Sequence, residues 1–319
     1  MSRRRYRGFV IGLSLVGAIA TVGGAARAQD APPESPPPAF VAPPPGYEPP
    51  TQYAQAGPPT QVVEEAAPTF LTLDRMDATT RIGIQLGWDK LDAVALSDAF
   101  LTRHELYGQY VFPGRIGGVY GTLATSHLFD LNASDATGYG NLDIGGFFLP
   151  THSSELILRA GLGAPTGSAS GQGPLANLLT GFERLTDLLL TQGNYTTLRL
   201  SASTVQHKDS LFLRADAGLD LAVDKPGGGG DTPSVFFRGN VAFGMRAPGV
   251  DITLELVNLA AVDGTVNGGI ENRFLHTAGF SLRTQGEDQF HLGTVLPLDD
   301  FPRGDLWIIS VGYQRAVSL

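Results

Sequence analysis

From residue 80 onward, apolar and polar side chains alternate along segments of about ten residues. In the first segment the apolar side chains stand at every second position, at Ile82, Ile84, Leu86 and Trp88. The same period returns at 142–148, 198–200, 211–217 and 250–256. A period of two places alternate residues on opposite faces of a β-sheet. The pattern therefore predicts an all-β chain.

The connections between these segments alternate between short and long. We expect twelve strands, at 80–89, 102–112, 116–128, 138–149, 153–164, 195–206, 208–223, 234–246, 250–259, 272–284, 287–296 and 305–319. The long connections are 90–101, 129–137, 165–194, 224–233, 260–271 and 297–304. Bacterial outer-membrane barrels have short turns on one side and long loops on the other, whereas a soluble sandwich has no reason to keep this order. The sequence predicts a 12-stranded antiparallel transmembrane β-barrel over 67–319.

Composition agrees with many strands joined by turns. The chain has 41 Gly and no Cys, so a disulfide scaffold and thiolate chemistry are excluded. No run of 18 or more apolar residues follows the N-terminal segment, so no transmembrane helix is expected in the mature chain. The last segment alternates to Leu319, which stands where outer-membrane barrels commonly carry a Phe that the assembly machinery reads. Outer-membrane lipid and that machinery are the expected partners.

The N-terminus is typical of a secretory signal peptide. Basic residues at 3–7 precede an apolar stretch at 8–22, and Ala26-Arg27-Ala28 offers a small-x-small cleavage pattern. An uncleaved anchor is the alternative, although the apolar stretch is short and rich in Gly and Ala. We expect a signal peptide at 1–28 and a mature chain that begins at Gln29.

A proline-rich stretch follows, and we assign 29–66 to a disordered periplasmic linker. Five Pro clusters lie between Ala31 and Gln61, and such a sequence favours extended polyproline II over helices or ladders. A docking site for a periplasmic or cell-wall partner is the alternative to a simple linker.

The net charge and the histidine positions argue against several classes of function. Cleavage after Ala28 would leave 17 Lys and Arg against 31 Asp and Glu, and such an acidic chain is a poor partner for nucleic acid. A phospholipase would need a Ser–His pair near the outer leaflet, but His152-Ser153-Ser154 falls in a predicted periplasmic turn. The remaining histidines considered, which lack paired spacing, are His104, His127, His276 and His291. We expect no enzyme, no metal site and no cofactor.

If the apolar face meets lipid, the charged residues of the strands line the lumen. They are Arg81, Arg103, Glu105, Asp143, Arg159, Arg199, Arg214, Asp216, Asp220, Arg238, Asp251, Glu255, Arg273 and Arg283. Such charges are tolerated only when paired or hydrated. They form either a polar pore that sets ion preference or a structural network that fills the barrel.

The long loop 165–194 has a helical period instead of a β period. Its apolar residues recur at three- and four-residue spacing, at Leu175, Leu178, Leu179, Phe182, Leu185, Leu188 and Leu189. An amphipathic helix is expected, with its start near Gly173 and its end near Gly193. Folded inward, the helix would plug or narrow the barrel or offer an apolar binding surface. Packed over the mouth, it would only cap the loops.

Two motifs resemble a known family. The strand Gly138-Tyr139-Gly140-Asn141-Leu142-Asp143-Ile144-Gly145 resembles the GxGDLxxG strand of the outer-membrane barrels called MetA-pathway-of-phenol-degradation-like. Leu162-Gly163-Ala164-Pro165-Thr166-Gly167 is similar to that family's strand end with PTG, and Ser310-Val311-Gly312-Tyr313 to its last strand. The chain departs from the family at Asn141, where Asp is usual, and in the long insertion after Gly167.

The resemblance implies an outer-membrane channel, in some members linked to aromatic or other hydrophobic compounds, and it supplies no catalytic residue. The first hypothesis is a passive channel for small solutes, gated or narrowed by loop 165–194. The alternative is a structural or surface-interaction barrel with a closed lumen.

Overall fold

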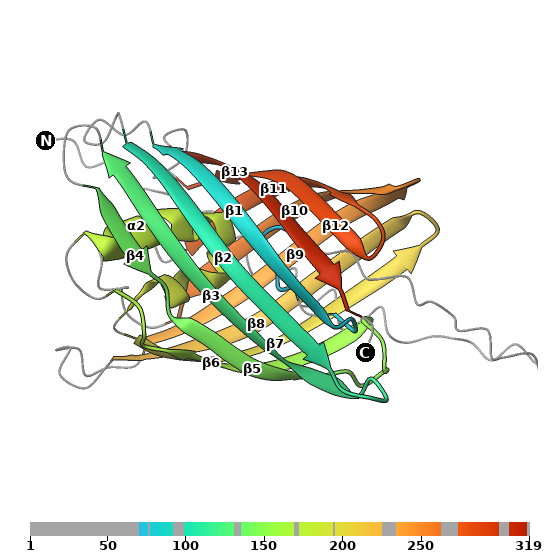
Figure 1. Cartoon of the computed structure of the whole chain (residues 1–319). Coiled ribbons are helices and arrows are strands. Elements are labelled where there is room, and N and C mark those ends of the chain that lie inside the picture. Colours follow the sequence, from blue (N-terminus) through green and yellow to red (C-terminus); the bar gives the residue numbers. More distant parts are fainter. Residues whose placement is uncertain are drawn as a thin grey trace, which may run out of the picture. The chain divides into compact units, whose positions relative to one another are not determined.

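A computed structural model of the chain shows antiparallel strands closed into a barrel (Figure 1). It describes residues 70–75, 77–91, 99–130, 135–168, 172–193, 195–224, 234–262, 274–299 and 306–317. The predicted signal peptide and linker, Arg273 and Leu319 lie outside these residues.

Thirteen strand segments make up the wall. They are β1 (Arg81–Leu91), β2 (Ala99–Val111), β3 (Gly117–Asp130), β4 (Ala136–Tyr139), β5 (Leu142–Phe148), β6 (Leu156–Ala164), β7 (Tyr195–Lys208), β8 (Leu211–Asp224), β9 (Ser234–Ala247), β10 (Val250–Ala261), β11 (Phe274–Thr284), β12 (Asp288–Pro297) and β13 (Leu306–Ala316). β4 and β5 both pair with β3 and together form one barrel strand. β1 pairs with β13 from Arg81↔Ala316 to Leu91↔Leu306, which closes the barrel. The predicted 12-stranded antiparallel barrel is confirmed.

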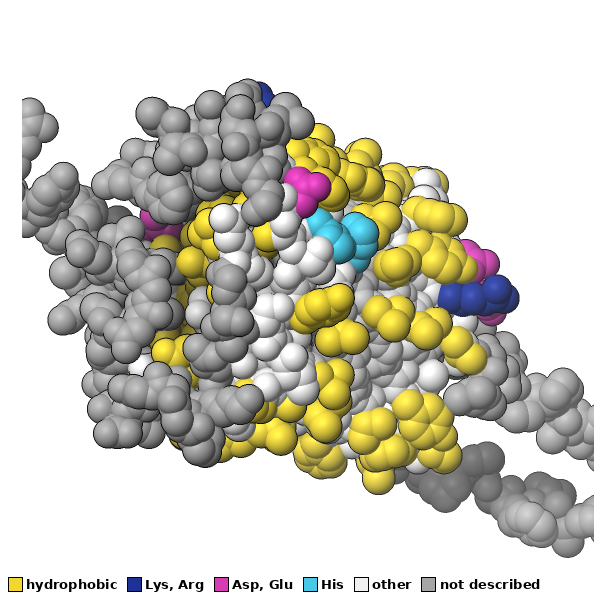
Figure 2. All heavy atoms as spheres, turned by 60° about the vertical axis from the view of Figure 1, so that its left-hand side comes forward, with side chains coloured by type: hydrophobic (Ala, Val, Ile, Leu, Met, Phe, Trp, Pro, Cys, Tyr) yellow, Lys and Arg dark blue, Asp and Glu magenta, His cyan; other side chains and the backbone are white. Residues whose placement is uncertain are grey.

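Polarity is inverted relative to a soluble protein. Large apolar side chains cover the outer wall in Figure 2, and Leu200 and Leu254 are each 58% exposed. The largest buried side chains include Arg199, Arg214 and Arg238. Charged residues are seldom fully buried unless they are paired, and an apolar exterior over a polar interior is what a lipid-embedded barrel requires.

Aromatic pairs mark both ends of this apolar wall. Phe100 and Phe129 lie 6.2 Å apart, between ring centroids, near the end with the long loops. Phe290 and Tyr313 lie 5.0 Å apart near the end with the short turns. Aromatic residues gather at the two membrane–water boundaries of such barrels. At the short-turn end, Gly249 has a φ of +80°, which glycine adopts without strain.

The fourth barrel strand is broken, where the sequence predicted one strand over 138–149. At the break the backbone N–H of Asn141 donates to Leu190 O at 2.7 Å, outside the wall ladder. The Asn141 side chain donates to Gln192 O and Tyr195 O at 2.8 and 3.0 Å, and accepts from Gly167 N at 2.9 Å. The strand breaks because Asn141 forms its hydrogen bonds with the ends of the long loop and not with the neighbouring strands.

That loop carries the predicted helix in two parts, α2 (Gly173–Thr180) and the 3₁₀ helix η1 (Gly181–Thr191), with a kink at Arg184. Every residue of η1 is buried, and the helix contacts β7, β10, β11 and β12. The loop therefore folds into the barrel, as Figure 1 shows for α2. No helix in the described part of the chain is long and apolar enough to cross a membrane.

The lipid-facing wall gives a first testable prediction. Leu200 lies near the middle of β7 and Leu211 at the short-turn end of β8, and both face outward. We expect Leu200→Arg to destabilise the barrel by about 2–4 kcal/mol and Leu211→Arg by about 0–1 kcal/mol, because the cost of a lipid-facing charge peaks at the bilayer midplane. Denaturant unfolding in lipid vesicles measures both. Equal costs at the two depths would contradict this membrane placement.

Candidate functional site: the plugged lumen

The barrel interior carries a network of charges from the wall. All described members of the predicted lumen set are buried: Arg81, Arg103, Glu105, Asp143, Arg159, Arg199, Arg214, Asp216, Asp220, Arg238, Asp251, Glu255 and Arg283. Several pair between strands: Arg238 of β9 lies 3.0 Å from Asp220 of the neighbouring β8, and Arg199 of β7 reaches past β6 to Asp143 of β5 at 2.9 Å. Buried charges are tolerated only when they are paired in this way.

A segment that the sequence analysis had assigned no role lies among these charges. Residues 70–75 and 77–80, which we call the N-terminal plug, run inside the barrel ahead of β1 (Figure 1). The backbone N–H groups of Leu71, Thr72 and Leu73 donate to the Glu255 carboxylate at 2.7, 2.7 and 3.2 Å. The Thr72 hydroxyl adds a fourth bond at 2.6 Å. Hydrogen bonds to a charged acceptor are stronger than neutral ones, so Glu255 is the principal anchor of this segment.

Asp74 ties the N-terminal plug to strands β6, β7 and β9. Its carboxylate lies 2.7 Å from Arg159 of β6 and 3.5 Å from Arg238 of β9, and it accepts from the Ser201 hydroxyl at 3.1 Å. Burial alone would raise the pKa of Asp74, but Arg159, Arg238 and Arg199 outweigh burial and lower the pKa well below its ordinary value. Asp74 is therefore an anion that links wall arginines of β6 and β9 to the N-terminal plug.

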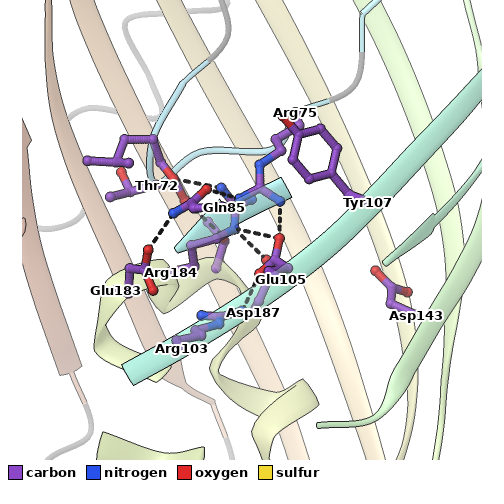
Figure 3. Close-up of polar contacts among 12 residues, drawn as sticks. Thr72, Arg75, Gln85, Arg103, Glu105, Tyr107, Asp143, Glu183, Arg184 and Asp187 are labelled. Carbon is purple, nitrogen blue, oxygen red and sulfur yellow. Dashed lines mark hydrogen bonds and ion pairs between the residues drawn. The ribbon is translucent and has the colours of Figure 1, made fainter. Parts of the chain in front are cut away.

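The inward-folded loop, residues 172–193, forms a second plug, which we call the loop plug. Its Arg184 donates to Leu71 O at 2.7 Å and Leu73 O at 2.9 Å, and its Thr186 hydroxyl donates to Thr72 O at 2.9 Å. Figure 3 shows Arg184 beside Thr72 and Arg75 of the N-terminal plug. The two plugs thus bind each other through the same backbone that Glu255 holds from the other side.

The loop plug also binds the wall. Glu183 accepts from the Gln85 amide at 2.6 Å and from the Ser310 hydroxyl at 2.7 Å. A Cβ at Gly87 would lie 2.2 Å from Glu183 Oε2, so a glycine at this strand position lets the carboxylate reach the wall. Asp187 lies 2.9 Å from Arg199. These contacts, spread over β1, β7 and β13, fix the loop plug inside the wall.

Arg75 of the N-terminal plug packs against wall residues of β1 and β2. Its guanidinium pairs with Glu105 and binds Gln85, as Figure 3 shows, and it lies 4.1 Å from the centroid of the Tyr107 ring. Beside it remains a cavity of about 20 Å³, bordered by Tyr107, Asp143 and Arg159. This volume is room for about one water molecule.

The lumen near the long loops is apolar. Leu179, Phe182, Leu185, Leu188 and Leu189 of the loop plug are buried in one core with wall residues Leu101, Leu128, Val257, Leu259, Leu275, Leu306 and Ile308. Leu178 packs against this core and is partly buried. Leu175, which the sequence placed in the same set, is 40% exposed because it lies in the first turn of α2, before the helix enters the core.

The residues considered for an enzyme have structural contacts instead. His152 binds Gly114 O through Nδ1 at 2.9 Å, and the Ser154 hydroxyl accepts from Ala78 N at 2.9 Å. Both lie at the β5–β6 turn and hold neighbouring backbone there. His291 is buried in the lumen against Gly312. Among the described residues, no group of three or more His, Asp or Glu side chains is placed to hold a metal ion.

Comparison with known proteins supports the fold. No protein-family model matches the chain, and no curated protein matches it. Among solved structures, an outer membrane channel from Pseudomonas putida F1 is 15% identical with a TM-score of 0.52, over 79% of this chain and 97% of that one. More distant are the NanC porin (8% identity, TM-score 0.44, 75% and 100%) and the CymD monoaromatic hydrocarbon channel (9%, 0.39, 76% and 90%).

At 15% identity, the likeness to the Pseudomonas putida channel shows a shared fold alone. The likenesses to NanC and CymD are too distant to support a conclusion. The fold is that of an outer-membrane β-barrel, here with both plugs inside. The resemblance to the phenol-degradation-like family stays a prediction.

Removing the charge of Glu255 tests the anchor. We expect Glu255→Gln to speed hydrogen exchange of the amides of residues 71–73 at least about 10-fold, because bonds to a charged acceptor contribute about 1.5–3 kcal/mol each. Exchange read by mass spectrometry on the folded barrel is the measurement. Asp288→Asn, on the outer wall, is the matched control and should leave these amides protected. Unchanged protection in Glu255→Gln would contradict the anchor.

The plug carboxylates predict a pH dependence. Asp187, like Asp74, has its pKa lowered: burial would raise it, but Arg184 and Arg199 outweigh burial. A carboxylate with a lowered folded-state pKa stabilises above its unfolded pKa, about 3.9, and loses this contribution as pH falls further. We expect both plugs to stay bound from pH 7 to about 4 and to loosen only below. Exchange of residues 70–75 along a pH series, corrected for intrinsic rates, checks this, and loosening between pH 7 and 5 would contradict it.

Proposed function

We propose that the protein is an outer-membrane channel for small solutes, held shut by the two plugs. The observation that carries the proposal is that chain segments, in addition to wall side chains, fill the lumen. Barrels of about eight strands are filled by their own side chains, and those of 16–18 leave an aqueous pore. A helix with its side chains is about 10–12 Å across. The wall by itself therefore encloses a passage about as wide as the loop plug.

The way the plugs are held supports reversible opening. Their contacts with the wall at mid-height are ion pairs and hydrogen bonds, such as Asp187 with Arg199 and Glu183 with Gln85. Burying an ion pair costs desolvation that largely offsets its attraction, so separating it into water-filled space costs little net free energy. The polar contacts at mid-height therefore add little to the cost of displacing the loop plug, which comes from its apolar core near the long loops.

The apolar part of the lumen favours a hydrophobic solute. Once the loop plug moved out, Leu101, Val257, Leu275 and Ile308 would face the passage near the long loops. Apolar walls with a few polar groups are what sites for small hydrophobic molecules present. Below them the solute would meet the charge network and the N-terminal plug, so both plugs act as gates in series.

The proposal includes the sequence-based expectations that no structural comparison tests. These are export by a signal peptide at 1–28, a periplasmic linker at 29–66, and assembly in outer-membrane lipid by the dedicated machinery. With the short turns in the periplasm, as outer-membrane barrels have them, the loop plug enters from outside and the N-terminal plug from the periplasm.

One observation favours the alternative, a structural barrel with a permanently closed lumen. Beside Arg75 the cavity holds about 20 Å³, so the described segments are well packed against one another. In that case the charge network fills the lumen and stabilises the barrel. The surface loops or the proline-rich segment would then make the contacts with partner molecules.

Conductance in planar bilayers separates these functions. We expect the full mature protein to be closed or to open rarely, and deletion of 173–193 or of 70–77 to raise the frequency of opening. Deletion of both should give steady steps, because each plug blocks a different part of the lumen. The folded state of every variant is checked by its shifted gel mobility before boiling. Silence from the folded double deletion would overturn the channel.

A further inference from the structure

Two histidines face outward on neighbouring strands, away from the lumen. His104 of β2 is exposed and His127 of β3 is half-buried, and their ring centroids lie 5.4 Å apart at an interplanar angle of 55°. Figure 2 shows histidine side chains, in cyan, among the apolar side chains of this wall. Neither histidine contributes to the plugs or to the proposed passage.

Strand register brings this pair together. His104 lies opposite Thr125, and Thr102 lies opposite His127, so the two histidines are diagonal neighbours on one face of the sheet. They are 23 positions apart in the chain, and their spacing therefore gave no metal signal. The expectation that these histidines bind no metal rested on that spacing alone.

Thr137 of β4 orients one of the rings. The hydroxyl of Thr137 lies 3.0 Å from Nδ1 of His127. When Nδ1–H donates to this hydroxyl, the lone pair is on Nε2, which is the tautomer that a metal ion requires. A metal-binding histidine usually donates its second ring N–H to an oxygen acceptor, and the Thr137 hydroxyl can accept in this way.

The height of the pair in the wall gives it access to ions. His127 lies two residues along β3 from Phe129, whose ring pairs with Phe100 at the long-loop end. Two residues of a tilted strand correspond to about 5 Å along the barrel axis. Polar side chains in a lipid-facing band are costly unless they find a partner, and here the partner can arrive from the membrane boundary.

We propose that His104 and His127 form a binding site for a divalent first-row transition metal ion, on the outer wall near the extracellular boundary. Imidazole nitrogens favour Zn²⁺, Ni²⁺ and Cu²⁺ over Mg²⁺ and Ca²⁺. Because no larger ligand group is found among the described residues, water fills the remaining coordination positions. Thr137 acts as a positioning residue through His127.

Copper binding to the untagged, refolded mature protein in lipid vesicles tests the site. With one equivalent of Cu²⁺, we expect an electron paramagnetic resonance spectrum with hyperfine coupling to two nitrogens. His104→Ala and His127→Ala should each remove the two-nitrogen signal and weaken Zn²⁺ binding, measured calorimetrically, at least about 10-fold. Thr137→Val should keep both ligands but weaken binding about 10-fold, as loss of an outer-shell partner does.

His276→Gln is the matched control, since His276 is a half-exposed histidine whose Nδ1 binds Asp299 at 2.8 Å, away from this pair. It should leave the copper spectrum unchanged. Two results would overturn the proposal: no two-nitrogen copper signal in the folded wild-type barrel, or a signal that persists in the double variant His104→Ala/His127→Ala. Conductance is not part of this test, so its outcome is independent of the channel function.

Discussion

A lipid bilayer offers no hydrogen bonds to a protein backbone, and this constraint decides the rest of the structure. Every strand must pair on both sides, so the sheet closes between β1 and β13. With alternate side chains on opposite faces, an apolar exterior forces the polar side chains of the same strands inward. Charges such as Arg199 and Arg238 then lie where bulk water is scarce, and they need partners.

The two plugs supply part of what the wall charges lack. Arg159 and Arg238 both reach Asp74 of the N-terminal plug, and Arg199 reaches Asp187 of the loop plug. In return, Glu255 of the wall binds backbone donors that would otherwise be buried without acceptors. Wall and plugs therefore complete each other's electrostatics, and a wall without plugs would need water in the same places.

The sequence predicted what depends on local pattern. Strand count and loop helix follow from periods of two and of three to four residues, and the structure confirms both. The same period of two predicted a lumen face, and its described charged residues are buried. The N-terminal plug could not be predicted, because its anchor, Glu255, is more than 180 residues from Leu71 and the segment has no periodicity of its own. The broken strand was missed for a similar reason: Asn141 looks like a strand residue until its partners Gln192 and Tyr195 are known.

Those partners give the glycine-rich motif a physical role. Asn141 binds the chain on both sides of the loop plug, accepting from Gly167 before it and donating to Tyr195 after it. At Gly138 a Cβ would lie 2.3 Å from Gly173 O, so the start of α2 can lie against the wall only where that side chain is absent. The motif therefore fixes the base of the loop while the leucines beyond it occupy the lumen. In the channel that we propose, the loop would move about this fixed base, and its mid-height contacts are the polar ones that water can replace.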